Sequence, residues 1–156
     1  MIVKAPLPAS SSLWPAVTSG DFFDGYSVES ALSPRAAADI GLTLPAWADR
    51  LLALRNALVR PFGLKAESTD SGDGAIFPVH LDTPAELVLG TDDRHLDFRI
   101  SVMQHAGRIH MGTWVHPHDW AGRAYLALVM PFHVLIVRDA LRRIARASIA
   151  SATPAQ

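Results

Sequence analysis

The sequence predicts an α+β fold in which a curved antiparallel sheet wraps around a long C-terminal helix. Runs of alternating polar and apolar residues, typical of strands, fill the middle of the chain. Residues 120–150 then have the apolar pattern of one long helix, interrupted or kinked near Pro131 because proline lacks a backbone N–H. We expect residues 125–137 of this helix to be enclosed by the sheet. A chain of 156 residues, 49% of them hydrophobic, is large enough for one core.

The elements before the middle of the chain are one strand and two helices. Residues 21–29 are predicted to form the strand. Ser33 and Pro34 are the residue types favoured at a helix N-cap and first helical position, and Gly41 ends the short helix that they begin. A second helix starts at Pro45 and should bury one apolar face. That face, with spacings of four, three and four, is formed by Trp47, Leu51, Leu54 and Leu58.

Four more strands follow, separated by residues that favour turns. They are predicted at residues 75–81, 86–89, 95–105 and 108–116. Gly107 marks a hairpin between the last two. If the apolar faces of these two strands match, one register follows. It pairs Phe98 with Val115, Ile100 with Thr113, Asp97 with His116 and Arg99 with Trp114.

This register gives the hairpin one apolar and one polar face. On the polar face a carboxylate should lie beside an imidazole, and a guanidinium over an indole. We expect the apolar face to line the core and a ligand cavity. The polar face, formed by Asp97, Arg99, Trp114 and His116, is expected to lie outward as a structural or partner-contact surface. The alternative places this polar face inside the pocket as the recognition or acid–base set.

The order of the elements indicates a single domain at residues 21–150, after an extended N-terminal arm at residues 1–20 and before a disordered tail at residues 151–156. A strand, two helices, several antiparallel strands and a long last helix follow one another in the helix-grip architecture. There a curved sheet wraps the last helix. The sequence therefore predicts a helix-grip-like domain.

Several short motifs carry a resemblance to a known family. They are Leu51-Leu52-Ala53-Leu54-Arg55-Asn56, Gly63-Leu64, Asp92-Asp93-Arg94-His95-Leu96-Asp97-Phe98-Arg99, Gly122-Arg123-Ala124-Tyr125, Pro131-Phe132-His133 and Leu141-Arg142-Arg143. Over residues 47–143 the chain resembles a bacterial family described as domain of unknown function 2867, related to helix-grip proteins of the START and Bet v 1 type. The resemblance implies a stand-alone version of a domain that also occurs appended to short-chain dehydrogenase-like proteins. It implies no assigned activity, and it leaves room for a homodimer or an oxidoreductase partner.

Composition excludes several classes of function. The chain has no cysteine, which excludes disulfides, thiolate metal sites and thiol nucleophiles, and its net charge of −1 gives no field for holding nucleic acid. His116 and His118 are spaced to share a strand face, but their spacing is a weak metal pattern, so we predict no metal site and no cofactor. The nearly apolar run at residues 124–137 is shorter than the roughly 20 residues that span a bilayer. With no signal-peptide pattern at the N-terminus, we expect a cytoplasmic protein without a membrane span.

The junction between the last strand and the last helix gathers polar residues. Asp119 is a natural N-cap, and free N–H groups there, with Arg123 and His118 nearby, would suit a carboxylate or phosphate of a ligand. His133 lies among apolar residues of the helix. Three interpretations are open for it: a hydrogen-bonded core histidine, a polar anchor in a ligand cavity, or a general base.

The function that these features favour is binding of a small apolar or amphipathic molecule in a cavity between the sheet and the last helix. The candidate ligand-binding residues are His118, Arg123, Tyr125, His133, Phe98, Ile100, Thr113 and Val115. One alternative is an enzyme of the same fold that uses His and Asp for acid–base chemistry on a polyketide-like or other carbonyl substrate. A subunit that docks a partner protein is another.

Overall fold

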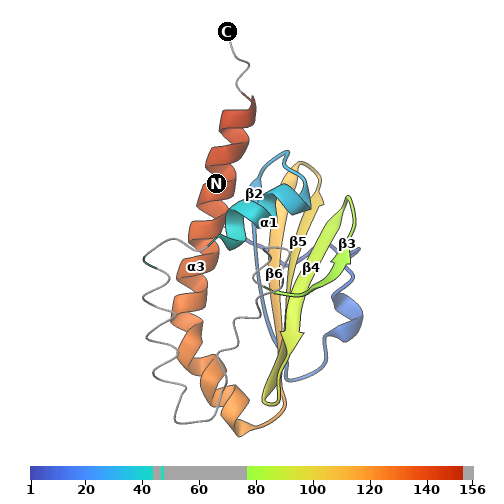
Figure 1. The fold of residues 1–156 in the computed structure, drawn as a ribbon, viewed down its shortest axis with the longest axis vertical. Coiled ribbons are helices and arrows are strands. Elements are labelled where there is room, and N and C mark those ends of the chain that lie inside the picture. Colours follow the sequence, from blue (N-terminus) through green and yellow to red (C-terminus); the bar gives the residue numbers. More distant parts are fainter. Residues whose placement is uncertain (44–46, 48–76, 153–156) are drawn as a thin grey trace.

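The computed structural model, which describes residues 1–43, Trp47 and residues 77–152, is a six-stranded antiparallel sheet with a long C-terminal helix beside it (Figure 1). This confirms the predicted α+β class. The strand order is β1-β2-β6-β5-β4-β3. The strands are β1 (Val3–Lys4), β2 (Phe22–Glu29), β3 (Val79–Asp82), β4 (Glu86–Asp92), β5 (Leu96–His105) and β6 (Arg108–Pro117). The helices are the 3-10 turn η1 (Trp14–Ala16), α1 (Pro34–Leu42) and α3 (Trp120–Ala152).

The β5–β6 hairpin has the register predicted from the alternation of its side chains. Its Cα partners include Phe98 with Val115, Ile100 with Thr113, Asp97 with His116 and Arg99 with Trp114. The chain reverses at Ala106 and Gly107, whose φ angles of 49° and 72° are both in the left-handed region. Two consecutive positive φ angles match the twist of a two-residue hairpin turn.

One face of the sheet packs against α1 and the second half of α3, and we call it the helix-facing surface. Ser33 caps α1 as predicted, since its hydroxyl accepts a hydrogen bond from the N–H of Ala36 at 3.2 Å. The buried core here comes from β2, β4, β5, β6 and both helices. Its members are Tyr26, Val28, Ala37, Ala38, Leu87, Leu89, Val102, Ile109, Met111, Val137, Ala140, Leu141 and Ile144.

The first half of α3 is less buried than predicted. The helix runs without a break through Pro131, so of the two predicted alternatives the interruption is wrong. The helix axis bends along its lower half (Figure 1). Between residues 125 and 137 only Val137 is buried, while Leu128 and Leu135 are 40% and 58% exposed, so the predicted enclosure of this stretch is also wrong. Among the described helices, α3 is long and apolar enough by composition to cross a membrane, yet its second half belongs to the core.

The N-terminal arm crosses the other face of the sheet, which we call the arm-facing surface. After β1 pairs with β2, Leu7 and Leu13 pack with Val88 and Trp114 in a second buried cluster. Gly112 makes this possible, because a Cβ there would lie 2.6 Å from the Leu7 side chain. The expectation that the polar face of the hairpin lies outward therefore needs correction, since the arm covers part of it.

The predicted second helix lies almost entirely outside the described residues. Trp47, which we expected on a buried helical face, is helical but 41% exposed. Its expected neighbours Leu51, Leu54 and Leu58 are not among the described residues.

Candidate functional site

The centre of the candidate site is a buried carboxylate on the helix-facing surface of β2. Side-chain alternation places Asp24 on this face, between Phe22 and Tyr26. Asp24 is 6% exposed. Its Oδ1 atom accepts a hydrogen bond from the N–H of Gly25 at 3.1 Å and lies 3.4 Å from Nζ of Lys4. One carboxylate oxygen is therefore occupied by the protein's own donors.

The second oxygen of Asp24 faces a histidine of α3. Nε2 of His133 lies 3.9 Å from Oδ2 of Asp24, which is too long for a hydrogen bond. Both atoms are buried, and neither has a hydrogen-bond partner among the described residues. Burial lowers the pKa of His133 although the Asp24 carboxylate acts in the opposite direction, so the imidazole is neutral at pH 7. The pair therefore consists of a carboxylate oxygen and a ring nitrogen that face each other, each without a hydrogen-bond partner.

A phenol and an ammonium group complete this polar set. Burial raises the pKa of the Tyr26 phenol, and so do the charge of the Asp24 carboxylate and a hydrogen bond to it, so the phenol is protonated at neutral pH. Nζ of Lys4 lies 5.9 Å from the centre of the Tyr26 ring. The positive charge of Lys4 offsets the negative charge of Asp24, so the site as a whole carries no net charge.

Apolar side chains surround the polar set, in rows that cross the sheet. Asp24 is paired with Thr113 and Thr113 with Ile100, so these three residues form one row. The next row runs from Phe22 through Val115 to Phe98. Four of these residues, Phe98, Ile100, Thr113 and Val115, were predicted from the sequence to contact a ligand. Thr113 is paired with Asp24 and Val115 lies in the next row of the same strand, whereas Ile100 and Phe98 lie one strand further away, on β5. Except for Val115, the four are only half-buried.

Aromatic contacts extend this apolar region. The ring of Phe22 meets the ring of His133 edge to face, with centroids 6.2 Å apart. Phe98 makes the same kind of contact with Phe77, at 4.9 Å. The carboxylate and the imidazole therefore lie at the boundary of an aromatic surface, which is the usual composition of a small-molecule site.

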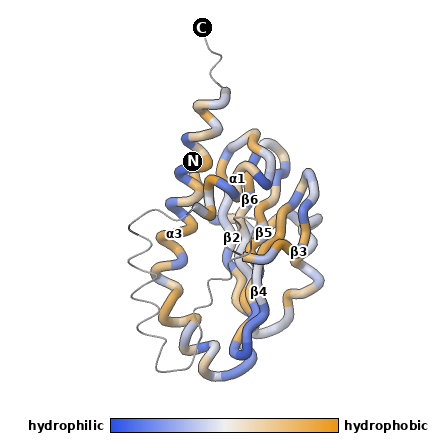
Figure 2. Tube along the Cα trace, viewed as in Figure 1, coloured by the Kyte–Doolittle hydropathy of each residue, from blue (hydrophilic) through white to orange (hydrophobic). Residues whose placement is uncertain are grey.

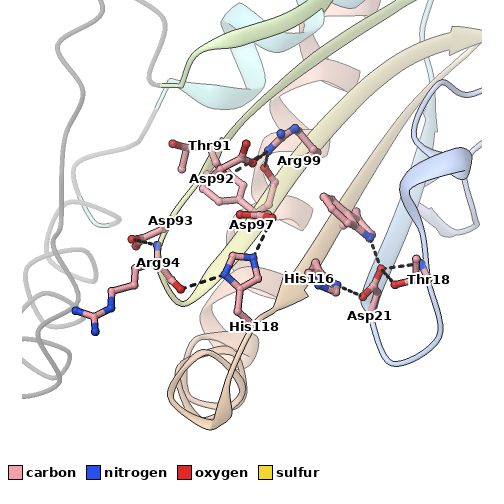
Figure 3. A network of polar contacts seen from close by, with 12 residues as sticks. Thr18, Asp21, Thr91, Asp92, Asp93, Arg94, Asp97, Arg99, His116 and His118 are labelled. Carbon is pink, nitrogen blue, oxygen red and sulfur yellow. Dashed lines mark hydrogen bonds and ion pairs between the residues drawn. The ribbon is translucent and has the colours of Figure 1, made fainter.

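A second polar cluster lies on the arm-facing surface and is organised by Asp21 (Figure 3). Oδ1 of Asp21 lies 2.6 Å from Nδ1 of His116, and its Oδ2 accepts hydrogen bonds from the indole N–H of Trp114 at 2.8 Å and from Thr18. Burial alone would raise the pKa of Asp21. The hydrogen bonds from His116, Thr18 and Trp114 outweigh it and lower the pKa to about 2.

His118 has both ring nitrogens engaged in the same region (Figure 3). Nε2 lies 2.9 Å from Oδ2 of Asp97, and Nδ1 lies 3.0 Å from the carbonyl oxygen of Arg94. Both partners are acceptors, so the ring satisfies both only when both nitrogens are protonated. In agreement, the hydrogen bond to Asp97 raises the pKa of His118. Both ring nitrogens of His118 are therefore occupied by contacts within the protein.

The cross-strand contacts expected on this face differ from those observed. The predicted register is correct, but Asp97 contacts His118 rather than His116. Arg99 does not use its guanidinium on the indole of Trp114; its Nη1 lies 2.7 Å from Oδ1 of Asp92 in β4. Alternation identifies residues that face each other across a ladder, whereas long side chains reach partners on a third strand or a turn. Figure 2 shows hydrophilic residues concentrated at this end of β4.

The start of α3 is closed by its own cap. Oδ1 of Asp119 accepts a hydrogen bond from the N–H of Gly122 at 2.8 Å, and Oδ2 lies 2.7 Å from Nδ1 of His95. These contacts, the Gly122 N–H first, lower the pKa of Asp119. The predicted N-cap is confirmed. Of the other candidates at this end of the helix, Arg123 is exposed and Tyr125 is half-buried.

Sequence reasoning found His133 but missed Asp24, Tyr26 and Lys4. A usable pattern was present, because an acidic residue alternates with aromatic residues along β2 and so shares their face. In the part of the chain that the structure describes, no group of three or more His, Cys, Asp or Glu side chains could hold a metal ion.

Comparison with known proteins places the chain in a family. The profile of a family described as protein of unknown function (DUF2867) matches residues 17–140. The chain belongs to this family. No curated protein and no solved structure matches it significantly. The part matched to DUF2867 contains Asp24, Tyr26 and His133, whereas Lys4 and most of the arm lie before it.

Proposed function

We propose that the protein binds a small apolar or amphipathic molecule between the sheet and α3, with the polar group of the molecule at Asp24 and His133. The observation that carries this proposal is the pair of buried atoms, Oδ2 of Asp24 and Nε2 of His133, that face each other without hydrogen-bond partners. A buried polar atom left unpaired costs about 1–3 kcal/mol. A ligand that satisfies both atoms would therefore be stabilised by them.

The apolar surroundings support the same site. Phe22, Phe98 and Ile100 remain half-buried on the helix-facing surface, and the first half of α3 is itself incompletely buried. Binding sites for small molecules combine such apolar walls with a few polar groups that fix orientation. Phe22 also contacts the ring of His133, so the apolar wall and the polar pair are continuous.

The test is a native mass spectrum of the purified protein, in which we expect a co-purified small molecule. Asp24→Asn and His133→Phe should reduce its occupancy. Asp97→Asn is the matched control, because Asp97 belongs to the polar face of the hairpin, opposite the row of Asp24 and Thr113. A ligand whose occupancy falls in the Asp97 variant and persists in the other two would contradict the proposal.

The same pair favours a second candidate, acid–base catalysis on a carbonyl compound. A neutral imidazole beside a carboxylate can remove a proton from carbon. A protonated phenol such as Tyr26 could donate a hydrogen bond to the carbonyl oxygen if the substrate replaced Asp24 as its partner. Solvent-deuterium exchange into the co-purified ligand would test it. Exchange that is abolished in His133→Phe supports catalysis, and a ligand that never exchanges leaves binding as the function.

A further inference from the structure

We infer that the bound molecule carries a neutral hydroxyl group, as in an alcohol or a phenol, which donates to Oδ2 of Asp24 and accepts from Nε2 of His133. This inference rests on the function proposed above and names the chemical class of the ligand. It follows from the separation of the two atoms, from the donors already bound to Asp24 and from the charges of the site.

The separation of the two atoms fits one bridging oxygen. A direct hydrogen bond would need about 3 Å, whereas Oδ2 and Nε2 are 3.9 Å apart. A single oxygen atom within about 3 Å of each can bridge them. Because neither atom is accessible to solvent in this structure, neighbouring side chains must move to admit the ligand.

The two atoms need opposite hydrogen-bond roles from that oxygen: Oδ2 of Asp24 needs a donor, and Nε2 of His133 needs an acceptor. Oδ1 of Asp24 already has the N–H of Gly25 and the ammonium group of Lys4. The Tyr26 phenol also interacts with this carboxylate, but Oδ2 has no partner in hydrogen-bond geometry and is the acceptor that needs a donor. His133 is neutral, and as the Nε2–H tautomer it donates at the atom that faces Asp24. A hydroxyl group donates once and accepts, so it satisfies both atoms at once.

Other common polar groups satisfy the pair less well. A carboxylate only accepts, and it would be buried against the negative charge of Asp24. An ether or a ketone also only accepts, so Oδ2 would stay unpaired. An ammonium group only donates, and it would add a second positive charge to a carboxylate already paired with Lys4. Unlike these groups, a hydroxyl both donates and accepts at a single atom, and it is the group that we assign to the ligand.

The experiment compares four probes that share the same alkyl chain: 1-octanol, octyl methyl ether, octanoate and octylammonium. Each is titrated calorimetrically into the ligand-free protein at pH 7. We expect 1-octanol to bind about tenfold more tightly than the ether, which is the effect of one hydrogen bond to a charged acceptor. Octanoate and octylammonium should bind more weakly still. Equal or tighter binding of the ether, the anion or the cation would overturn the inference, and the equal result would mean that only water bridges the pair.

The variant His133→Phe isolates the polar contribution, because it keeps an aromatic ring beside Phe22 and removes both nitrogens. We expect the tenfold preference for the alcohol over the ether to fall to about twofold or less, with far-UV circular dichroism unchanged. Asp24→Asn, with a donor amide in place of one oxygen, should reduce the preference as well. His105→Phe at the exposed hairpin is the control and should keep it.

The outcome also separates this inference from the function it rests on. If all four probes bind with similar affinity and compete with the co-purified molecule, the site exists and the hydroxyl assignment is wrong. If no probe binds and no molecule co-purifies, the proposed function itself fails.

Discussion

At the scale of the residue, the tightest conformational constraint lies in the β5–β6 turn. Ala106 has a φ of 49°, a left-handed conformation that costs an L-residue with a Cβ roughly 1–2 kcal/mol. Asparagine tolerates this conformation, and Asn-Gly is the preferred pair for a turn with two positive φ angles. The sequence showed the turn through Gly107, but alanine gave no indication that its own φ is positive.

We predict that Ala106→Asn stabilises the protein by about 0.5–1 kcal/mol, because it relieves this conformational cost. Urea unfolding monitored by tryptophan fluorescence measures the change. Gly107→Ala provides the opposite control and should destabilise by about 1 kcal/mol, since Gly107 has a φ of 72°. A neutral or destabilising Ala106→Asn would show that another constraint sets this turn.

At the scale of the element, one arginine of α3 fixes the end of α1. The guanidinium of Arg143 donates to the carbonyl oxygens of Ile40, Gly41 and Thr43, and its Nε lies 3.0 Å from Oδ2 of Asp139. The last carbonyls of a helix have no partner within the helix, and cationic side chains satisfy them well. Arg143 therefore holds the two helices together on the helix-facing surface.

We predict that Arg143→Met lowers the free energy of unfolding by about 1–3 kcal/mol, the range for lost hydrogen bonds to a charged group. Arg142→Met is the matched control, because Arg142 is exposed and should change stability by less than about 0.5 kcal/mol. Chemical denaturation of both variants at one pH makes the comparison. Similar losses in the two would mean that the contacts of Arg143 contribute nothing beyond its charge.

The elements that the sequence predicted well are those whose pattern is local. Alternation gave the β5–β6 register, and Ser33 with Pro34 marked the start of α1, because both depend on neighbours in sequence. The pairing of Asp24 with His133 depends on how a strand and a distant helix pack, and no local pattern contains that contact. The prediction that residues 125–137 are enclosed by the sheet failed for the same reason. Apolar composition does not show how closely a sheet approaches a helix.

At the scale of the whole molecule, the sheet is held between two layers, and the arm is tied to its face by one carboxylate. Glu86 is 4% exposed. Its Oε1 accepts hydrogen bonds from the hydroxyls of Ser11 and Ser101, both at 2.6 Å, and its Oε2 accepts one from the N–H of Ser12 at 2.9 Å. Burial raises the pKa of Glu86, but the hydrogen bonds from Ser101, Ser11 and Ser12 outweigh it and lower the pKa.

We predict that Glu86→Gln destabilises the protein by about 1–3 kcal/mol, because an amide replaces one acceptor oxygen with a donor that faces other donors. The loss should be accompanied by faster amide hydrogen exchange at Leu13, a residue of the arm that packs against the sheet. Glu29→Gln, at an exposed carboxylate, is the control. Unchanged exchange at Leu13 in the Glu86 variant would show that the apolar contacts alone hold the arm.

The titrating groups of both surfaces together set the dependence of stability on pH. Burial lowers the pKa of His133 and of His110, so their contribution is complete above pH 6.5 and is lost as the pH falls through 6.5 toward the lowered values. The raised pKa of His118 acts in the opposite sense, but His118 is exposed and its effect is screened by solvent. Stability should therefore begin to fall just below pH 6.5.

A second fall in stability should come from Asp21. Its pKa is lowered from 3.8 to about 2, so the stability it contributes is complete above pH 4 and is lost as the pH drops from about 4 to 2. We predict that Asp21→Asn costs about 2 kcal/mol at pH 7 and nearly nothing at pH 2, because the wild-type carboxyl is then half protonated or more. Unfolding free energies measured from pH 2 to pH 8 test this, with Asp39→Asn at an exposed position of α1 as the control. A cost that stays constant across this range would mean that Asp21 acts through packing and not through the charge that His116, Trp114 and Thr18 stabilise.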